Sequence, residues 1–255
     1  MTPERIAFLY RIRAAVADTT AERLPLEALL APADDGPLLT ALAGRTRNQR
    51  MELLLQLIAH AAPLNLQVTT CATLTVAAGR IAAITLASEP EFSGQKALIL
   101  HEHPLLQALA LDTLAELENI PKQWTSGATP RVRAQTLAAS IGITVADWGI
   151  AESATIVQLT RPGRPRSTSL VPSIHIALLP LSHLVADLAE AFALVRREPE
   201  PASMVLISGP SKTADIEGCM VLGAHGPRAL HLLVLTGAAD AAAPGFPVAS
   251  CSQCC

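Results

Sequence analysis

From residue 64 onward, short apolar runs alternate with longer runs whose apolar residues recur at helical spacing. Near-continuous apolar segments such as LQVTT, KALILHE, SIHIALLP, SMVLISG and ALHLLVL are typical of strands that are covered on both faces. An alternation of such strands with helices predicts an α/β fold with a mainly parallel sheet flanked by helices. We expect this domain to span residues 63–236.

The chain on either side of this domain has a different character. Before it, apolar residues at helical spacing predict an N-terminal helical arm over residues 1–62, with a Pro- and Gly-containing loop at 31–48 and a helix at 50–61. After it, residues 237–255 are rich in Ala and Pro, end in CSQCC, and are predicted to be a disordered tail. The predicted organisation is therefore arm, α/β domain and tail.

Within the domain, the spacing of apolar residues also predicts where the helices lie. Long helices are expected at 74–84, at 104–118, where Pro104 opens the helix, and at 181–197. A shorter helix is expected at 213–220, directly after the strand SMVLISG. These helices alternate with the strands, as the α/β prediction requires.

Composition and charge exclude several classes of protein. Half of the residues are hydrophobic and 16% are charged, below the roughly 25% that is usual for soluble proteins, which speaks against general disorder. The 19 Lys and Arg nearly balance the 22 Asp and Glu, so a nucleic-acid binder with a basic face is not expected. No stretch offers the roughly 20 uninterrupted apolar residues of a membrane span, so none is expected.

Cysteine usage and the first residues bear on location. Five cysteines, three of them among the last five residues, do not form the even, spaced set of a disulfide framework. Glu4, Arg11 and Arg13 interrupt what would be the basic and apolar regions of a signal peptide. We therefore expect a cytoplasmic, reduced protein. The three thiols of CSQCC are fewer than the four of a usual iron–sulfur site, so no metal is expected there.

The segment ISGPSKTADIEG, residues 207–218, is the strongest candidate for chemistry. An apolar strand ends in small residues, and Thr213 is predicted to cap the short helix that follows. Backbone N–H groups and hydroxyls at a helix N-terminus, beside a lysine, favour an anion. A tight turn with an ordinary capped helix fits the same residues, and both interpretations stay open. The candidate anion-binding residues here are Ser208, Gly209, Ser211, Lys212, Thr213, Asp215 and Glu217.

A second candidate lies in DWGIAESAT, residues 147–155. Glu152 stands among small residues at the junction of two apolar strands, where a carboxylate can act as a base or a covalent nucleophile. The alternative is a turn whose glutamate accepts hydrogen bonds from backbone N–H groups. The residues themselves leave both interpretations open.

The histidines and arginines supply further candidates. His225 stands in the Gly-flanked turn of VLGAHGPRALH, where an accessible imidazole can bind an anion, donate a proton or ligate a metal. His175 and His231 lie within apolar strands and are interpreted as core or edge residues. The basic stretch RPGRPRSTSLVP, residues 161–172, either closes over a carboxylate or phosphate or forms a solvated hairpin loop. The P-loop, GxGxxG and Gly-x-Ser-x-Gly patterns are absent.

Three segments together resemble the lactate-utilisation protein C family (LutC/YkgG, the LUD domain). They are GIAESAT at 149–155, SLVPSIHI at 169–176 and SGPSKTADIEGCMVLGAHGP at 208–227, and the resemblance covers roughly residues 50–236. It implies a fold similar to that of the NagB/RpiA/CoA-transferase-like proteins. It also implies a subunit of a complex that oxidises L-lactate to pyruvate together with two iron–sulfur-containing partner subunits, LutA-like and LutB-like.

The resemblance also suggests roles for single residues. Glu152 and His225 become the candidate catalytic residues, and Ser153 and Thr155 join the candidate ligand-binding residues. Ala154 stands where the family tends to have glycine, so a positive φ at this position would be strained.

The implied ligand is a small anion such as lactate. No cofactor is expected in this chain, since the iron–sulfur clusters belong to the partners. Two alternatives stay open: a stand-alone enzyme or binding protein for a CoA, phosphosugar or folate-type ligand, and a non-catalytic assembly subunit.

Overall fold

The computed structural model describes residues 5–8, 10–11, 34–90, 95–199, 201–214 and 220–237. The chain divides into two compact units, Met1–Gly36 and Pro37–Cys255. In the first unit, residues 5–8 and 10–11 are helical. The predicted disordered tail lies outside the described residues, apart from Gly237. The sheets and the candidate site belong to the second unit.

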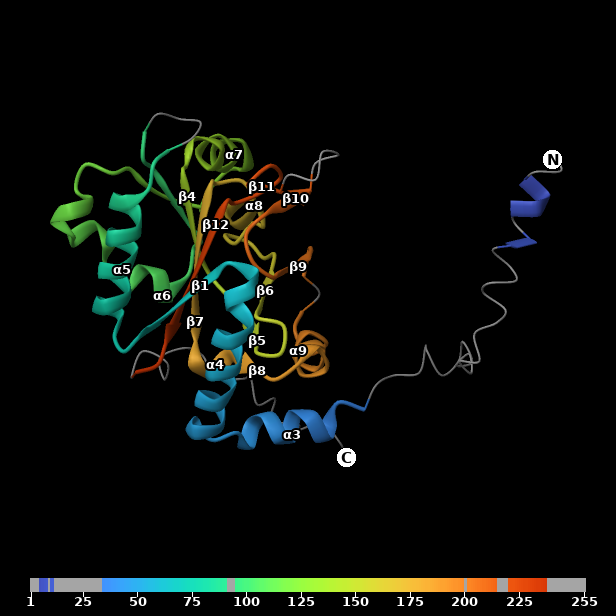
Figure 1. The fold of residues 1–255 in the computed structure, drawn as a ribbon. Helices are drawn as coiled ribbons and strands as arrows, with labels where there is room; N and C mark the ends of the chain where they lie inside the picture. Colours follow the sequence, from blue (N-terminus) through green and yellow to red (C-terminus); the bar gives the residue numbers. More distant parts are fainter. Residues whose placement is uncertain are drawn as a thin grey trace. The chain divides into compact units, whose positions relative to one another are not determined.

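A six-stranded sheet forms the centre of the second unit (Figure 1). Its strands lie in the order β1-β12-β7-β4-β2-β3, and every neighbouring pair is parallel. The α/β class predicted from the sequence, with a mainly parallel sheet flanked by helices, is confirmed. The strands are β1 Leu66–Cys71, β2 Leu98–Leu100, β3 Lys122–Trp124, β4 Ile141–Val145, β7 Ile174–Pro180 and β12 Ala229–Leu235.

A second sheet of four strands lies against the first. Its order is β8-β5-β6-β9, with β5 and β9 antiparallel to β6, and β8 parallel to β5. A separate two-stranded hairpin, β10 with β11, follows β9. The bounds are β5 Trp148–Ile150, β6 Thr155–Leu159, β8 Leu184–Val185, β9 Met204–Ile207, β10 Lys212–Ala214 and β11 Met220–Leu222.

The helices begin where side chains can cap them. The α4 helix starts with a capping box in which Thr46 and Gln49 bond reciprocally, and Thr73 and Asp187 cap α5 and α9. Within the described ranges, no helix combines the length and the apolar character needed to cross a membrane. The helices are α3 Gly36–Gly44, α4 Arg47–Ala61, α5 Leu74–Ala87, α6 Pro104–Gln107, α7 Thr129–Ala138, α8 Ser167–Leu170 and α9 Leu188–Val195. Single 3-10 turns lie at η1 Ala62–Leu64, η2 Leu111–Thr113, η3 Ala115–Leu117 and η4 Leu181–His183.

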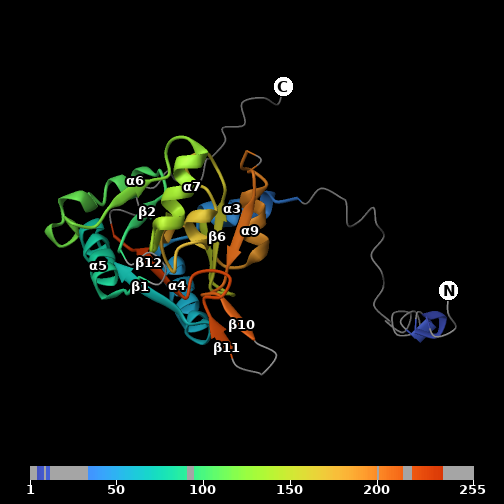
Figure 2. The same cartoon turned by 90° about the horizontal axis from the view of Figure 1, so that it is seen from above.

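Alternation along the strands of the large sheet separates two cores. In β12, Leu233 and Leu235 face α5 and α6, whereas Leu232 and Val234 face α4 and the small sheet. A third core lies between the other face of the small sheet and α9, and it includes Trp148. Figures 1 and 2 show the resulting order of layers: α5 and α6, the large sheet, the small sheet, and α9. Burial on both faces explains why β2, β4, β7 and β12 are largely apolar.

Two long helices predicted from spacing are wrong. The helix expected at 104–118 ends after Gln107, because Ala110 takes a left-handed φ of 49° and the chain continues as 3-10 turns. This reversal brings both Leu111 and Leu117 into the core. The helix expected at 181–197 is interrupted by β8, which pairs with β5, so that α9 begins only at Leu188.

Two further expectations need correction. The loop expected at 31–48 contains α3. The short helix expected at 213–220, with Thr213 as its cap, is contradicted by β10 and β11, in which Thr213 pairs with Val221. Antiparallel pairing of β10 with β11 engages the backbone groups of both segments, and no helix N-terminus is therefore formed at Thr213.

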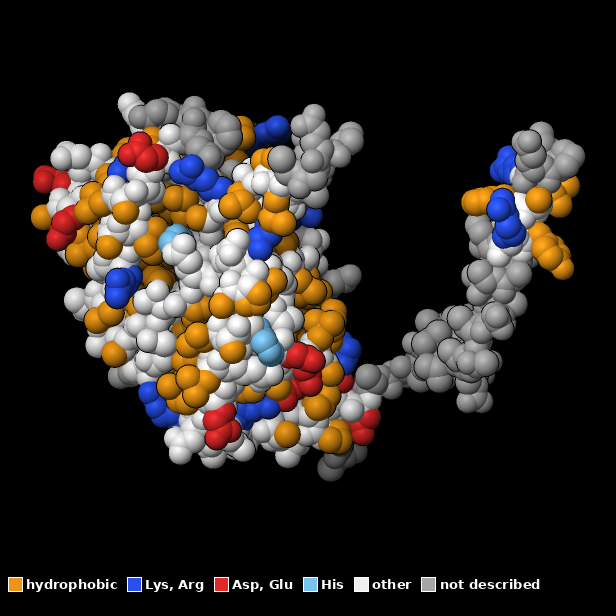
Figure 3. Space-filling view, in the orientation of Figure 1, with side chains coloured by type: hydrophobic (Ala, Val, Ile, Leu, Met, Phe, Trp, Pro, Cys, Tyr) orange, Lys and Arg blue, Asp and Glu red, His pale blue; other side chains and the backbone are white. Residues whose placement is uncertain are grey.

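Apolar side chains make up much of the face of the molecule that Figure 3 draws. On the face drawn in Figure 3, apolar side chains are spread widely and charged side chains are dispersed among them. Met220, Val221 and Leu222 of the hairpin are exposed apolar residues. The low charge of the composition is thus visible on the outside of the fold as well as in its core.

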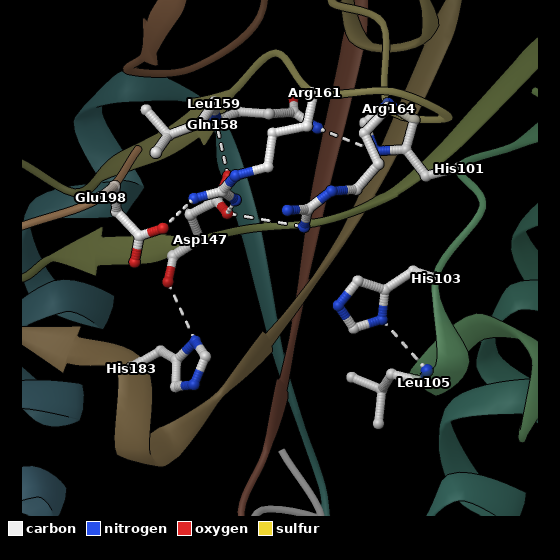
Figure 4. Close-up of polar contacts among 10 residues, drawn as sticks. All are labelled: His101, His103, Leu105, Asp147, Gln158, Leu159, Arg161, Arg164, His183 and Glu198. Atoms are coloured by element: carbon white, nitrogen blue, oxygen red, sulfur yellow. Dashed lines mark hydrogen bonds and ion pairs between the residues drawn. The ribbon is translucent and has the colours of Figure 1, made fainter. Parts of the chain in front are cut away.

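A group of partly buried charges joins the two sheets at the carboxyl edge of the large sheet (Figure 4). Asp147 lies in the bend between β4 and β5, and its carboxylate accepts the backbone N–H of Leu159 at 2.7 Å. Arg161 and Arg164 lie 2.5 and 3.5 Å from the same carboxylate, and Arg161 also contacts Glu198 at 2.5 Å. The Asp147 side chain therefore connects the end of β6 and the turn after it to the bend where the chain passes from the large sheet to the small one.

We predict that Asp147→Asn lowers the free energy of unfolding by about 3 kcal/mol, because two arginines lose their buried counter-charge. Glu198→Gln is the matched control, since Glu198 contacts one of the two arginines and is more exposed than Asp147. We expect it to cost about 1 kcal/mol or less. Urea unfolding of both variants measures the difference, and equal losses would contradict the central role of Asp147.

Candidate functional site

A cavity of about 180 Å³ lies where the two sheets meet the segments on either side of the β10–β11 hairpin, residues 208–211 and 225–227. It adjoins the amino ends of β7 and β12, the opposite edge of the large sheet from the Asp147 group. Its volume is below the roughly 300–1,000 Å³ of pockets for drug-sized ligands, so it suits a small metabolite. The lining residues are Ser169, Leu170, His175, Val205, Leu206, Ile207, Ser208, Gly209, Pro210, Ser211, His225, Gly226, Pro227 and Leu230.

Two glycines allow the walls of this cavity to form. Gly209 has a φ of +100°, and a Cβ there would lie 2.7 Å from the carbonyl oxygen of Leu64. In β4, Gly142 leaves room for the backbone of Thr168, into which a Cβ would run. The α8 helix can therefore pack directly on β4 and β7, and its last two residues, Ser169 and Leu170, reach the cavity.

Four of the residues predicted from the sequence come together at the cavity. Ser208, Gly209, Ser211 and His225 all line it. The exposed His225 is held by its backbone N–H, which donates to Ser211 Oγ at 3.3 Å. The residues before the hairpin, Ser208 to Ser211, and His225 after it thus lie next to each other at the cavity.

The second predicted segment adjoins the cavity through hydroxyl groups. Because β6 pairs with β9, Thr155 lies beside Ser208, and their hydroxyl oxygens are 2.6 Å apart. Ser153 Oγ lies 2.8 Å from Thr155 Oγ1 on the other side. The structure therefore connects Ser153, Thr155 and Ser208 in one chain of hydroxyls that ends at the cavity.

Other predicted residues lie away from the cavity. Glu152 is exposed, and its backbone N–H donates to the carbonyl of Ala186 at 3.0 Å. Lys212 and Thr213 belong to β10 and do not line the cavity. Asp215 and Glu217 lie outside the described residues.

The polar residue with the most unusual environment is His175. It is fully buried, lines the cavity, and has Nε2 2.8 Å from Thr144 Oγ1. Its Nδ1 has no hydrogen-bond partner among the described residues. Burial lowers the pKa of this imidazole to about 3, so the ring is neutral at ordinary pH. Its position within an apolar strand led us to interpret it as a core residue, and the missing partner can be recognised only in three dimensions.

A second buried histidine, His101, has both ring nitrogens in polar contacts. His101 Nε2 donates to the carbonyl of Pro165 at 3.1 Å, and its Nδ1 lies 3.3 Å from Gln158 Nε2. Burial lowers its pKa to about 3 as well. With both nitrogens engaged, His101 is a structural residue, whereas His175 keeps one nitrogen unused.

Histidines also flank the charged group at the carboxyl edge. His183 Nδ1 donates to the carbonyl of Asp147 at 2.9 Å. His103 Nδ1 accepts the N–H of Leu105, and burial, with a smaller contribution from Arg164, lowers its pKa to about 4. Within the ranges that the structure describes, no three His, Cys, Asp or Glu side chains gather as a metal site would require. Cys251, Cys254 and Cys255 lie outside those ranges.

The fold is α/β, and its cavity lies at the amino ends of β7 and β12, beside β9 of the small sheet. The family model for the LUD domain matches residues 49–235. The chain therefore belongs to the LUD domain family.

Several known proteins are similar to this chain. "Lactate utilization protein C" of Exiguobacterium sp. is 44% identical over 117 residues, which cover 44% of this chain and 51% of the relative. The protein of the same name from Halalkalibacterium halodurans is 34% identical over 150 residues, covering 56% and 64%. The chain thus spans about half the length of the curated relatives it matches. The crystal structure of a DUF162 family protein from Deinococcus radiodurans is 20% identical, with a TM-score of 0.49, and covers 73% of this chain and 98% of that one.

The buried histidines predict a loss of stability in acid. Unfolded histidine has a pKa near 6.5, whereas folded His101 and His175 have values of about 3. Between these values the unfolded state binds protons that the folded state does not, so the free energy of unfolding falls as pH falls. The slope approaches about 1.4 kcal/mol per pH unit for each histidine. Urea unfolding from pH 7 to pH 4.5 tests this, and His101→Gln must show a shallower slope than wild type.

The turn between β5 and β6 predicts a contrast between two alanines. Ala154 and Ala151 are both fully buried, but Ala154 alone of the two has a positive φ, of 46°. Replacing Ala151 with glycine should cost about 1–2 kcal/mol in lost methyl burial and backbone entropy. In Ala154→Gly, relief of about 1 kcal/mol of left-handed strain should offset much of that loss. Thermal or urea unfolding of both variants compares them, and equal destabilisation would mean that Ala154 is unstrained.

Proposed function

We propose that this chain serves lactate utilisation as a subunit of an iron–sulfur L-lactate-oxidising complex, and that its cavity binds a small anionic ligand such as lactate. Membership of the LUD domain family and the name "Lactate utilization protein C" of its relatives support the lactate role. The single observation that carries the binding role is the cavity lined by Ser208, Ser211, His175 and His225. The cytoplasmic location expected from the cysteine usage belongs to the same proposal.

The size of the cavity favours a small ligand over the larger alternatives. About 180 Å³ accommodates a molecule of a few carbon atoms, whereas CoA and folate-type ligands need pockets of drug-sized volume or more. The lining contains neither lysine nor arginine. A carboxylate would therefore be held by neutral donors, and we expect millimolar rather than micromolar affinity.

Oxidation of lactate to pyruvate releases two protons and two electrons. One proton leaves the hydroxyl group, for which a base is needed. His225 is the candidate at the cavity, and Glu152 precedes Ser153, which connects to the cavity through Thr155. The electrons must pass to an acceptor outside this chain, for which the iron–sulfur clusters expected in LutA-like and LutB-like partners are the candidates.

Two observations favour the alternative of a non-catalytic subunit. Glu152 is exposed and does not line the cavity, and the buried His175 has its pKa lowered to about 3, which makes it a weak base. In that case the chain would bind ligand and partners while the chemistry occurred elsewhere in the complex.

We expect material purified on this chain from host cells grown on L-lactate to reduce a dye in a lactate-dependent manner, whereas the chain by itself is inactive. His225→Ala should lower that activity about 100-fold if the imidazole transfers the proton. Glu152→Gln tests the carboxylate in the same assay.

The outcomes separate the two versions of the proposal. Activity that survives both substitutions in an intact complex favours the non-catalytic subunit. If wild-type material shows neither lactate-dependent activity nor iron–sulfur partners, the lactate role is refuted.

A further inference from the structure

The hydrogen bond between Thr144 and His175 decides which ring nitrogen carries the proton. Thr144 is fully buried, and His175 Nε2 is the one partner that the described residues offer its hydroxyl. If Nε2 donated to that oxygen, the threonine hydrogen would be buried without an acceptor, which is costly. The network is better satisfied when Thr144 donates to Nε2. A neutral imidazole has one N–H, so Nδ1 then carries it and is a buried donor without a partner among the described residues.

The contacts of Thr155 set the opposite polarity at Ser208. Thr155 Oγ1 lies 3.2 Å from the carbonyl oxygen of Ser153, which can only accept. It also lies within 2.8 Å of Ser153 Oγ and 2.6 Å of Ser208 Oγ. A hydroxyl has one hydrogen, so all three contacts are hydrogen bonds only when Thr155 donates to the carbonyl and accepts from both serines. Ser208, which is exposed and lines the cavity, then donates its hydrogen to Thr155, and its oxygen is left as an acceptor.

We propose that two buried threonines, Thr144 and Thr155, set the hydrogen-bond polarity of the cavity, so that His175 donates and Ser208 accepts. The cavity then selects a small molecule that has an acceptor oxygen at one end and a hydroxyl at the other. The ligand part rests on the proposed function, whereas the polarity belongs to the protein without ligand. Thr144 and Thr155 are positioning residues, and His175 and Ser208 determine specificity.

This polarity distinguishes a hydroxy acid from the matching keto acid. L-Lactate and pyruvate share a carboxylate, which can accept from His175. They differ at the second carbon. Lactate has a hydroxyl hydrogen there that can be donated to Ser208 Oγ, whereas pyruvate has a carbonyl oxygen that would face the lone pairs of Ser208 Oγ. Because an unpaired or mismatched polar group loses a hydrogen bond, we expect L-lactate to bind about 10-fold more tightly than pyruvate.

The first test needs no ligand. In ¹⁵N-labelled protein at pH 7, the nitrogen shifts of His175, assigned by their loss in His175→Gln, should show hydrogen on Nδ1. Thr144→Ser keeps the hydroxyl and should keep this tautomer, whereas Thr144→Val removes the donor and should shift the ring toward the other tautomer. Hydrogen on Nε2 in wild type would overturn the inference, whether or not lactate binds.

The second test titrates L-lactate and pyruvate into wild type and two variants, using ligand-detected NMR because weak binding is expected. In Thr155→Val the Ser208 hydrogen is released and can donate to a keto oxygen, so the 10-fold preference should narrow to about 2-fold. Thr160→Val is the matched control. It removes an equivalent threonine–serine contact, 2.8 Å to Ser203, just beyond the other end of the same two strands and away from the cavity. The control should keep the preference.

Three results have distinct meanings. A preference in wild type and Thr160→Val that narrows in Thr155→Val supports the inference. Equal binding of the two acids to wild type overturns the inferred selectivity and leaves the proposed function standing. Binding of neither acid refutes the proposed ligand and with it the selectivity inferred here, irrespective of the tautomer.

Discussion

The fold depends on the charge that Asp147 buries at the bend between the two sheets. Here the chain leaves β4 of the large sheet and enters β5 of the small one. The Asp147 carboxylate holds the N–H of Leu159 and the two arginines of the following turn. Buried carboxylates are stable only when their oxygens are fully paired, so the relative position of the sheets is tightly constrained at this point. The cavity, which residues of both sheets line, therefore depends on this fixed position of the sheets.

The two edges of the large sheet consequently have different roles. Open α/β sheets usually bind ligands beyond the carboxyl ends of their strands. In this protein the acids at that edge, Asp147 and Glu198, are paired with arginines of the same chain. At the amino edge the charges are absent from the cavity lining, and neutral groups such as His175 and Ser208 remain. Rigid pairing at one edge and unused hydrogen-bonding capacity at the other are what a binding site on a stable scaffold requires.

Patterns along the sequence predicted those elements whose formation depends mainly on neighbouring residues. Apolar runs located β1, β2, β7 and β12 of the large sheet, whereas β3 is a polar segment that no such run marks. Two of the candidate residues, Ser208 and His225, line one cavity in the structure. The helix expected after Pro104 was wrong because Ala110 reverses the chain to bury Leu117, which depends on the core. The hairpin at Thr213 depends on pairing with a strand further along the chain. His175 could not be singled out, because its neighbours in sequence are core residues and its unpaired nitrogen is a property of packing.

The place of β12 in the large sheet has a consequence for synthesis of the protein. This strand follows every other described strand in the chain, yet it lies between β1 and β7. Until it emerges from the ribosome, β1 and β7 present open apolar edges of the kind that pair with other chains. The cavity, lined in part by Gly226 and Leu230, cannot exist before that moment. A ligand that binds in the cavity can therefore stabilise the chain only after β12 has paired with its neighbours.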